Sequence, residues 1–431
     1  MNALRELNVQ LYGQHVGVLS RTDAFSNNAS LHYADSYRRQ PDATPLSLSL
    51  PLTRADHEAD RVSSWLWGLL PDNEILLERL ASRAQVSGRD IFGLIAYVGR
   101  DVAGAAQFLT EVSTGPDDGL KLISADELAA RVADIRRQVA EHAPSEYDNG
   151  RWSLAGAQAK VALRFEDDGW YLPEGREPST HIIKPSIPGF ENFDLNEAAI
   201  LNTAQRIGLV ASDATVLPLT DGTHALVSRR YDRAREPDGS WIRIHQEDLC
   251  QALGVRPGQK YEADGGPGVA RIASLLKQLP SASRDARFRF FDALVFSWAV
   301  AATDGHAKNY SLLLDGAQAR LAPIYDVNSA LPYTRPWGRR YRDVKKLHSA
   351  HTINTTSAFT RITVDDWQAV AHRLSVPRDT VRGTLRRIAT HAAATLPAVY
   401  TELADGIELE PAQRVNWSDV LEQYHHSLHV P

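Results

Sequence analysis

An acid and an amide late in the chain have the spacing of a phosphoryl-transfer site. Asp304 lies in the segment ATDGHAKNYSLLL, directly after a strongly apolar run, and Asn309 follows five residues later. In protein kinases an Asp and an Asn at this spacing form the catalytic loop, where the Asp accepts the proton of the substrate hydroxyl and the Asn binds magnesium. So loose a pattern also arises by chance, and a simple Thr-Asp-Gly turn would account for Asp304 as well.

A second acid follows 22 residues after the first. Asp326 ends the segment LAPIYD, which we predict to be a short apolar strand. A carboxylate and an amide suit Mg²⁺, which neutralises the triphosphate of ATP. Asp304, Asn309 and Asp326 together therefore predict a Mg²⁺-ATP site, and a turn residue at a strand end is the alternative for Asp326.

A lysine and a glutamate upstream could complete such a site. Lys184 stands at the end of the short β run HIIKPSI, and Glu197, 13 residues on, begins a predicted helix. In kinases a strand lysine that contacts the phosphates pairs with a helix glutamate. An exposed Glu favoured by the helix dipole explains Glu197 equally well.

The segment SLAGAQAK, residues 153–160, contains small residues that let backbone amides approach phosphates. We expect it to join two strands. It lacks the G-x-x-x-x-G-K-[ST] frame of a Walker loop, so an ordinary hairpin turn remains the alternative.

Periodicity predicts the elements that would position these residues. Hairpins are expected around Gly13-Gln14 and Asp221-Gly222, because alternating apolar and polar residues flank each turn. Apolar residues at helical spacing predict amphipathic helices over 73–84 and from 125 onward, the latter after a Ser124–Glu127 capping box. Two further helices are expected, 200–209, stopped by Gly208, and the apolar, buried segment 288–303, after which Asp304 follows.

Composition limits the classes of protein. The 431 residues, 43% hydrophobic and 23% charged, suggest two or three packed globular units. Cys250 is the only cysteine, which excludes an intrachain disulfide or a cysteine metal cluster. The start has no apolar signal core and the longest apolar run, 293–302, is about half of a membrane span. We therefore expect a cytoplasmic protein with no membrane contact.

The net charge of -6 argues against a dedicated nucleic-acid-binding protein. The best local candidate for such a contact is the basic segment 335–346, RPWGRRYRDVKK. A solvated surface loop is the alternative.

Taken in order along nearly the whole chain, these motifs resemble the HipA family of toxin kinases. The resemblance is carried by TPLSLSLPL, LLPDN, RWSLAGAQAK, THIIKP, QEDLCQ, KYEADGGPG, TDGHAKN and IYD. It implies an α+β, two-lobed, protein-kinase-like fold. In that fold a β-rich amino-terminal subdomain, 1–145, is fused to a small lobe, 146–240, which carries the nucleotide loop and hinge and precedes a helical large lobe, 241–431.

The resemblance also implies a role for each residue of an ATP and Mg²⁺ site. Asp304 would be the catalytic base, Asn309 and Asp326 the magnesium ligands, and Lys184 the phosphate contact. The nucleotide loop would be Ala155, Gly156, Ala157, Gln158, Ala159 and Lys160. The pocket would also be lined by His306, Ala307, Lys308, Asn309 and Tyr325, with Arg229, Arg230 and Tyr231 as the adenine-side hinge. At Arg229 the sequence departs from members that carry an acid, so adenine contacts there are expected to be rearranged.

Ser153 matches the serine that family members autophosphorylate. Its position in the loop makes a free hydroxyl plausible, and a hydroxyl bonded locally at a strand end is the alternative. A phosphoserine carries about -1.5 to -2 charges and would lie close to the nucleotide phosphates, so we expect autophosphorylation to switch the kinase off.

Family membership further implies a HipB-like antitoxin, contact with operator DNA mainly through that antitoxin, and a protein substrate. The substrate would be an aminoacyl-tRNA synthetase, typically the glutamyl enzyme, whose modification inhibits translation and growth. A small-molecule phosphotransferase and a catalytically silent corepressor are the alternatives. The 145 amino-terminal residues argue against the first, and the intact Asp304, Asn309, Asp326 and Lys184 against the second.

Overall fold

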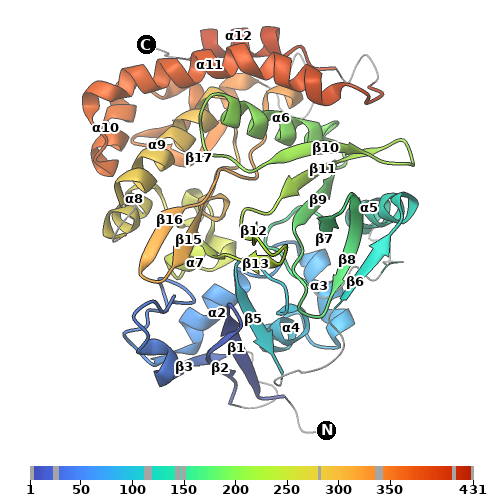
Figure 1. Ribbon diagram of the computed structural model, residues 1–431. Coiled ribbons are helices and arrows are strands. Elements are labelled where there is room, and N and C mark those ends of the chain that lie inside the picture. Colours follow the sequence, from blue (N-terminus) through green and yellow to red (C-terminus); the bar gives the residue numbers. More distant parts are fainter. Residues whose placement is uncertain are drawn as a thin grey trace. The chain divides into compact units, whose positions relative to one another are not determined.

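The computed structural model describes residues 4–22, 29–110, 119–140, 147, 152–279, 283–334, 343–409 and 414–428 (Figure 1). The chain forms two compact units, each built from three segments. The first unit consists of Met1–Ile183, Arg230–Gly258 and Leu312–Ala319, and the second of Lys184–Arg229, Gln259–Ser311 and Arg320–Pro431.

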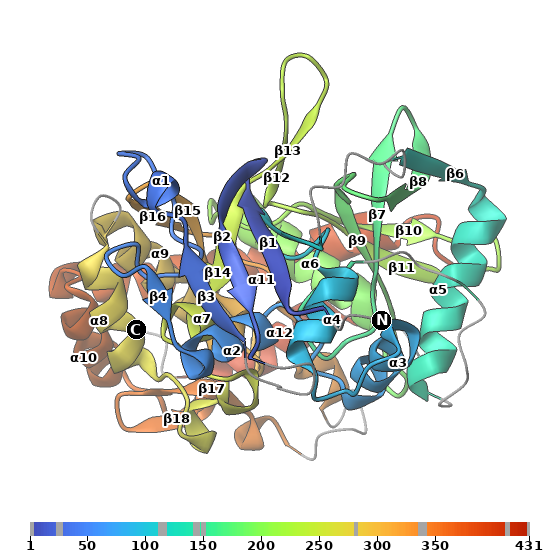
Figure 2. The same ribbon diagram turned by 90° about the horizontal axis from the view of Figure 1, so that it is seen from below.

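The first unit contains a five-stranded antiparallel sheet from the amino-terminal part of the chain (Figure 2). Its strands are β1 (Glu6–Leu11), β2 (Gln14–Ser20), β3 (Ser30–Tyr33), β4 (Asp56–His57) and β5 (Ala106–Leu109), in the order β4-β3-β2-β1-β5. The predicted hairpin is confirmed: Tyr12 and Gly13 adopt positive φ, 53° and 76°, at a two-residue turn. Helices α2 (Ala59–Trp67) and α4 (Ile91–Val98) contact each other, and contact β3 and β5 respectively.

Strands β9, β7, β8 and β6 are neighbours in that order in a second, six-stranded sheet, and their pairings are antiparallel. These four strands are β6 (Gly119–Ile123), β7 (Val161–Glu166), β8 (Gly169–Glu174) and β9 (His181–Pro185). The predicted nucleotide loop directly precedes β7. The unit also contains α1 (Asp35–Arg38), α3 (Glu74–Ala84), α5 (Ala125–Ala140), α7 (Leu249–Ala252), β14 (His245–Asp248) and the hairpin of β12 (Arg233–Arg235) and β13 (Trp241–Arg243). The predicted helices at 73 and 125 are therefore confirmed, and the N-cap of α3 is Asn73.

A buried network of charges lies inside the first unit. Asp101, at the end of the amino-terminal segment, accepts hydrogen bonds from Arg233 (2.8 Å) and from the hydroxyl of Ser179 (2.6 Å). Arg230 donates two bonds to Asp232, at 3.0 and 2.9 Å. Burial alone would raise the pKa of both carboxyls, but the neighbouring guanidinium groups outweigh it, holding the pKa of Asp101 well below its usual range and that of Asp232 at about 2.

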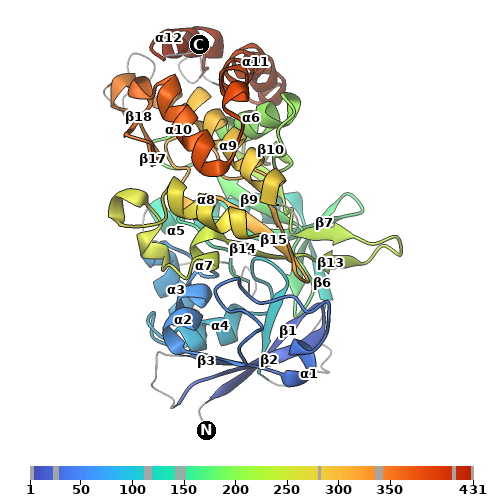
Figure 3. The same ribbon diagram turned by 90° about the vertical axis from the view of Figure 1, so that its left-hand side faces the viewer.

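Helices dominate the second unit (Figures 1 and 3). The long α11 packs against α6, α9, α10 and α12, and the hairpin predicted around Asp221-Gly222 is formed by β10 and β11. The elements are α6 (Phe193–Arg206), β10 (Ala214–Pro218), β11 (His224–Arg229), α8 (Val269–Gln278), α9 (Ser283–Ala299), β17 (His348–Ile353), β18 (Thr356–Ala358), α10 (Val364–Leu374), α11 (Arg378–Ala404) and α12 (Trp417–His426). Strands β15 (Ser311–Asp315) and β16 (Gln318–Leu321) lie where the chain passes between the two units.

Several local predictions were wrong. The segment LAPIYD is not a strand: β16 ends at Leu321, and Ile324 makes only an isolated bridge to Ala211. The loop 153–160 precedes one strand, β7, because Trp152 forms a single bridge to Asp101 and no strand. Helix α6 begins at Phe193, so Glu197 lies one turn inside the helix.

The part of the chain predicted to form a helical large lobe also contains the strands β13 to β18. The predicted domain boundaries at 145 and 240 remain predictions, and residue 145 lies outside the described residues. So do residues 335–342, most of the predicted basic segment. Within the part of the chain that the structure describes, no helix is both long and apolar enough to cross a membrane.

Candidate active site

The buried helix α9 presents the loop that contains Asp304. The side chains of Phe290, Phe291, Phe296 and Trp298 are buried, so the end of this helix is fixed by its core contacts. The helix is terminated by Ala301, which has a φ of 53°, and by a bond from the amide of Ala302 to the carbonyl of Ser297 (2.8 Å). Asp304 then emerges as an exposed residue on a rigid base.

Asn309 closes this loop. Its side-chain amide donates to the backbone carbonyl of Asp304 at 2.7 Å and lies 3.5 Å from that of Asp326. The amide of His306 also donates to the Asp304 carbonyl (2.8 Å), and Asn309 itself is 7% exposed. One amide thus joins the two predicted acidic segments within the second unit.

Lys184 joins Asp326 to Glu197. Its ammonium group lies 2.7 Å from a carboxylate oxygen of each. Burial disfavours the ammonium, but the two carboxylates outweigh it and raise the pKa of Lys184. Burial raises the pKa of Glu197, and Lys184 opposes that effect. The predicted Lys184–Glu197 pair is present, with Glu197 only 1% exposed, whereas the alternative required an exposed glutamate.

Asp326 adopts a strained backbone conformation. Its φ of 55° lies in the left-handed region, which side chains with a Cβ rarely occupy and which costs about 1 kcal/mol or more. Its side chain remains 34% exposed while Lys184 beside it is buried. The strain directs a carboxylate into the cluster and leaves part of it accessible to a ligand.

The other residues predicted to line the pocket near Asp304 and Asp326 form hydrogen bonds with the protein or are buried. Tyr325 donates its hydroxyl to the carbonyl of Lys308 at 2.7 Å and lies 2.6 Å from the hydroxyl of Ser311. His306, Ala307 and Lys308 are buried. These residues fix the loop around Asp304 and Asn309.

Sequence reasoning missed one residue of this cluster. The hydroxyl of Tyr261 donates to Oδ1 of Asp304 at 2.6 Å. Tyr261 belongs to KYEADGGPG, which is part of the family resemblance but received no role, because 43 residues separate it from Asp304. Only the fold brings them together.

The donor set fits a divalent cation that the nucleotide helps to bind. Among the described residues no group of three or more His, Cys, Asp or Glu side chains could hold a metal ion alone. Mg²⁺ in phosphoryl-transfer sites is held by one or two carboxylates together with substrate phosphates. The accessible carboxylate of Asp326 and the adjacent amide of Asn309 supply hard oxygen ligands of that kind.

The predicted nucleotide loop lies in the first unit, where the segment 69–73 holds it. The amide of Asp72 donates to the carbonyl of Gly156 (3.1 Å), and the side chain of Asn73 to the carbonyl of Ala157 (3.3 Å). Gly156 has a φ of 109°, and a Cβ there would lie 2.7 Å from Nζ of Lys160. Lys160 in turn donates to the carbonyl of Ala155 at 2.6 Å.

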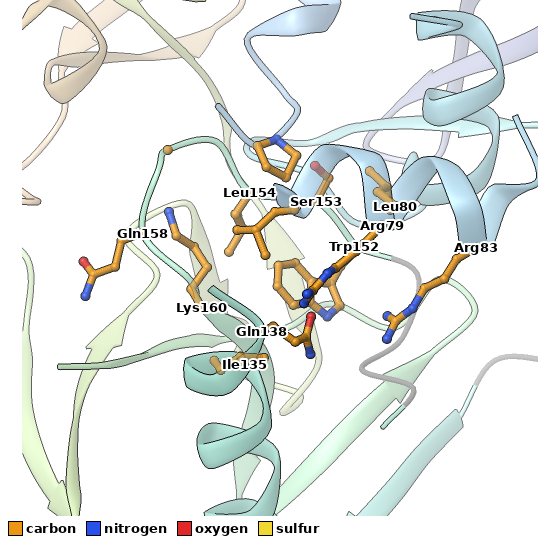
Figure 4. A pocket seen from close by; sticks show the side chains of 13 residues that line it. Arg79, Leu80, Arg83, Ile135, Gln138, Trp152, Ser153, Leu154, Gln158 and Lys160 are labelled. Carbon is orange, nitrogen blue, oxygen red and sulfur yellow. The ribbon is translucent and has the colours of Figure 1, made fainter. Parts of the chain in front are cut away.

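Ser153 is buried at the start of this loop. It is 1% exposed, and its hydroxyl donates to the carbonyl of Leu69 at 2.7 Å. Beside it lies a pocket lined by Arg79, Arg83 and Trp152 among others (Figure 4). In this conformation the Ser153 hydroxyl is not free, and its partner is not a local group but the carbonyl of Leu69, 84 residues earlier in the chain.

The predicted hinge residues are engaged with protein groups. The amide of Arg229 donates to Asp213 in the second unit, and that of Arg230 to Thr180 in the first, both at 2.9 Å. The guanidinium of Arg230 belongs to the buried charge network, and the hydroxyl of Tyr231 bonds to Gln246 at 2.5 Å. The side chain of Arg230 is therefore committed to the core of the first unit.

Comparison with known proteins identifies the family. Residues 7–109 match the HipA N-terminal domain, and residues 152–396 the HipA-like C-terminal domain. The chain is 34% identical to the putative kinase Y4mE of Sinorhizobium fredii over 412 residues, covering 94% of each. It is 29% identical to the serine/threonine-protein kinase toxin HipA of Shewanella oneidensis over 335 residues, covering 74% of this chain and 73% of that protein.

A solved structure is similar over almost the whole chain. It is Shewanella oneidensis HipA, determined in a complex with HipB and its operator DNA. The TM-score is 0.78 at 25% sequence identity, covering 98% of this chain and 96% of that one. The predicted α+β, two-lobed kinase-like fold is thereby confirmed. The chain belongs to the HipA family of serine/threonine-protein kinase toxins.

Proposed function

We propose that this kinase transfers the γ-phosphate of ATP to a protein hydroxyl, with Asp304 as the general base. One observation carries the proposal: the buried pair of Lys184 and Glu197 is joined to the partly exposed Asp326, which Asn309 connects to the Asp304 loop. A structural ion pair alone would not need the strained Asp326 or the exposed Asp304.

In the proposed step the acceptor oxygen attacks the γ-phosphorus. The bond from that phosphorus to the β,γ-bridging oxygen breaks, ADP leaves, and the hydroxyl proton passes to the carboxylate of Asp304. The exposure of Asp304 supports this role, because a protein substrate has to reach the base from solvent.

Asp326 and Asn309 would hold Mg²⁺. The ion supplies neutralisation of the triphosphate charge. Lys184, fixed by Glu197, would contact the phosphates with its ammonium group. Residues 155–160 would contribute backbone amides to the phosphates, and residues 229–231 would contribute to binding the adenine.

Autophosphorylation of Ser153 would act as an off switch. The hydroxyl is buried against Leu69, so the loop has to leave the segment 69–73 before Ser153 can receive a phosphoryl group. A doubly charged phosphoserine would be costly to return to that buried position, so the loop would stay displaced and ATP binding would weaken.

Mixing inactive Asp304→Asn protein with active kinase tests this switch. Transfer between molecules should label Ser153 of the inactive partner, and the labelled fraction should bind ATP less tightly. Phosphate found elsewhere by intact-mass and peptide analysis, or unaltered ATP affinity of the labelled protein, would refute the switch.

The partners follow from the relatives. The Shewanella oneidensis protein was determined with HipB and operator DNA, and we propose a HipB-like antitoxin for this chain. Arg378, Arg382 and Arg386 on α11 are exposed and spaced four residues apart, so they share one face and could add phosphate contacts to an antitoxin-bound operator.

An aminoacyl-tRNA synthetase, typically the glutamyl enzyme, is the proposed substrate, with arrest of translation in the cytoplasm as the result. Treating a bacterial lysate with the protein and ATP, followed by phosphopeptide mass spectrometry, tests the class of substrate. The expected product is one dominant synthetase phosphosite that the Asp304→Asn protein fails to produce. Labelling of small molecules alone would refute a protein substrate, and no magnesium-dependent consumption of ATP would indicate a silent corepressor.

A further inference from the structure

The hydroxyl of Tyr261 occupies one oxygen of the proposed base. The 2.6 Å separation from Oδ1 of Asp304 lies within the range of hydrogen bonds from a hydroxyl to a carboxylate, which are shorter and stronger than neutral ones. A carboxylate offers two oxygens as acceptors. Tyr261 therefore fixes the position of Oδ1 of Asp304.

The ring of Tyr261 is fixed by its neighbours. The ring of His306 packs edge-on against it, with centroids 4.8 Å apart and planes at 78°. The ammonium group of Lys260 lies 5.6 Å from the ring centroid. The ring thus contacts the same loop whose acid its hydroxyl reaches.

The backbone of Tyr261 is equally constrained. Its carbonyl accepts bonds from the amides of Asp264 (3.1 Å) and Gly266 (2.9 Å). A Cβ on Gly266 would lie 2.1 Å from the carbonyl oxygen of Gln259 and 2.6 Å from that of Tyr261, so this close turn requires glycine.

The next residue anchors this turn to a strand. The carboxylate of Glu262 accepts a bond from the amide of Thr352 in β17 at 2.6 Å. Burial raises the pKa of Glu262, but the imidazole of His351, 3.8 Å away, and the bond from the amide of Thr352 outweigh it and lower the pKa overall. The turn that presents Tyr261 is therefore fixed independently of Asp304, and displacing the phenol would disturb several contacts.

We propose that Tyr261 is a positioning residue for phosphoryl transfer. Its hydroxyl holds one oxygen of the Asp304 carboxylate and so orients the carboxylate toward the acceptor hydroxyl. The inference rests on the proposed role of Asp304 as the base.

A tyrosine held in this way has a signature in the pH dependence. A hydrogen bond donated to a carboxylate lowers its pKa, because it stabilises the charged form. Tyr261→Phe removes the donor and keeps the ring, so the pKa of the base should rise. The acidic limb of the kcat/KM profile should then move upward by about 1 pH unit, the shift that corresponds to one hydrogen bond to a charged group.

The rates are measured as transfer from [γ-³²P]ATP to casein, a generic acceptor protein, at saturating Mg²⁺. We expect kcat at neutral pH to fall roughly 10-fold through lost orientation of the base. The KM for ATP should change less than about twofold, because Lys184 bonds to both Glu197 and Asp326 without any contact from Tyr261 being needed.

Two controls separate positioning from a general effect on folding. Tyr37→Phe makes the same chemical change in the other compact unit, where the hydroxyl donates to the carbonyl of Thr44 at 2.9 Å, and it should leave the acidic limb in place. Replacing Tyr261 by 3,5-difluorotyrosine keeps the hydroxyl but strengthens it as a donor, and it should move the acidic limb to lower pH than in the unmodified enzyme.

The outcomes separate this inference from the proposed function. If Asp304→Asn is inactive while Tyr261→Phe has an unshifted acidic limb and full kcat, Tyr261 does not position the base. An increase of kcat/KM in Tyr261→Phe would show that the phenol blocks the acceptor site. Phosphotyrosine at position 261 would show that Tyr261 is itself a phosphoryl acceptor. Either result overturns positioning. If Asp304→Asn retains turnover, the proposed function itself has failed.

Discussion

The catalytic loop and the nucleotide loop are held in opposite ways. Asn309 and the backbone of residues 304–309 close the catalytic loop on itself, and Asp304 is exposed. The nucleotide loop is held by residues 69–73, which lie 84 positions earlier in the chain, and Ser153 is buried there. The loop 304–309 therefore has a fixed shape and an exposed carboxylate. The loop 153–160 instead buries a hydroxyl, and its contacts with residues 69–73 would break together if the loop moved.

The contacts that hold the nucleotide loop are also weaker than those around the Asp304 loop. Residues 69–73 are joined to the nucleotide loop by hydrogen bonds, among them those of Ser153 and Asn73, and a typical one contributes about 0.5–1.5 kcal/mol net. Breaking any one of these bonds should therefore cost little. The Asp304 side contains the buried Lys184–Glu197 pair, and removing one partner of a buried pair typically costs about 3–5 kcal/mol.

Removing the proton acceptor should have the largest effect. We expect Asp304→Asn to lower kcat by ~10² to 10⁴-fold while folding and ATP affinity remain near wild type, because the amide has the same shape and cannot accept the proton. Single-turnover transfer from ATP to casein measures it. Asp264→Asn, at an exposed acid of the same unit, is the matched control and should be fully active. Wild-type turnover in the Asp304 variant would remove it from the catalytic role.

Breaking the ion cluster should affect nucleotide affinity as well as rate. Asp326→Ala removes a proposed magnesium ligand and a partner of Lys184, so we expect Mg²⁺-ATP to bind at least about 10-fold more weakly. Calorimetric titration of ATP with and without magnesium measures the loss. Asp365→Ala, at an exposed acid at the start of α10, provides the comparison. If the magnesium-dependent part of the affinity is unchanged, Asp326 lies outside the site.

Loosening the nucleotide loop should have the smallest effect. Asn73 caps α3 by accepting from the amides of Ile75 and Leu76, and it also donates to the carbonyl of Ala157. Asn73→Asp keeps the cap and replaces that donor by an oxygen. We expect Ser153 to be labelled about 3- to 10-fold faster in the mixing experiment, since one lost hydrogen bond of about 1 kcal/mol corresponds to roughly fivefold.

Asn73→Ser, which also caps helices but places no charge against the carbonyl, should lie between wild type and Asn73→Asp. Equal labelling rates in all three proteins would show that residues 69–73 do not control access to Ser153.

The sequence predicted the residues of the candidate site better than the contacts that hold them. Asp304, Asn309, Asp326 and Lys184 could be found because their types and spacing match those of a kinase site. Tyr261 and the segment 69–73 could not, because their roles depend on pairings over 43 and 84 residues.

Errors of local structure had a related cause. Residues 321–326 are apolar enough for a strand, yet only Leu321 belongs to β16, and Ile324 makes a single isolated bridge to Ala211, which is distant in the chain. The adenine hinge was assigned by resemblance alone, so the burial of the Arg230 side chain could not be foreseen.

The buried charge network limits which truncated forms of the protein can fold. Asp101 belongs to the segment that precedes the kinase motifs, yet it neutralises Arg233 and, with Asp232, the environment of Arg230. A truncation beginning near residue 150 would leave these guanidinium groups in the core with one carboxylate fewer. Such a fragment should be recovered as insoluble aggregate. Expression of a shorter kinase would require either keeping the amino-terminal segment or replacing Arg230 and Arg233.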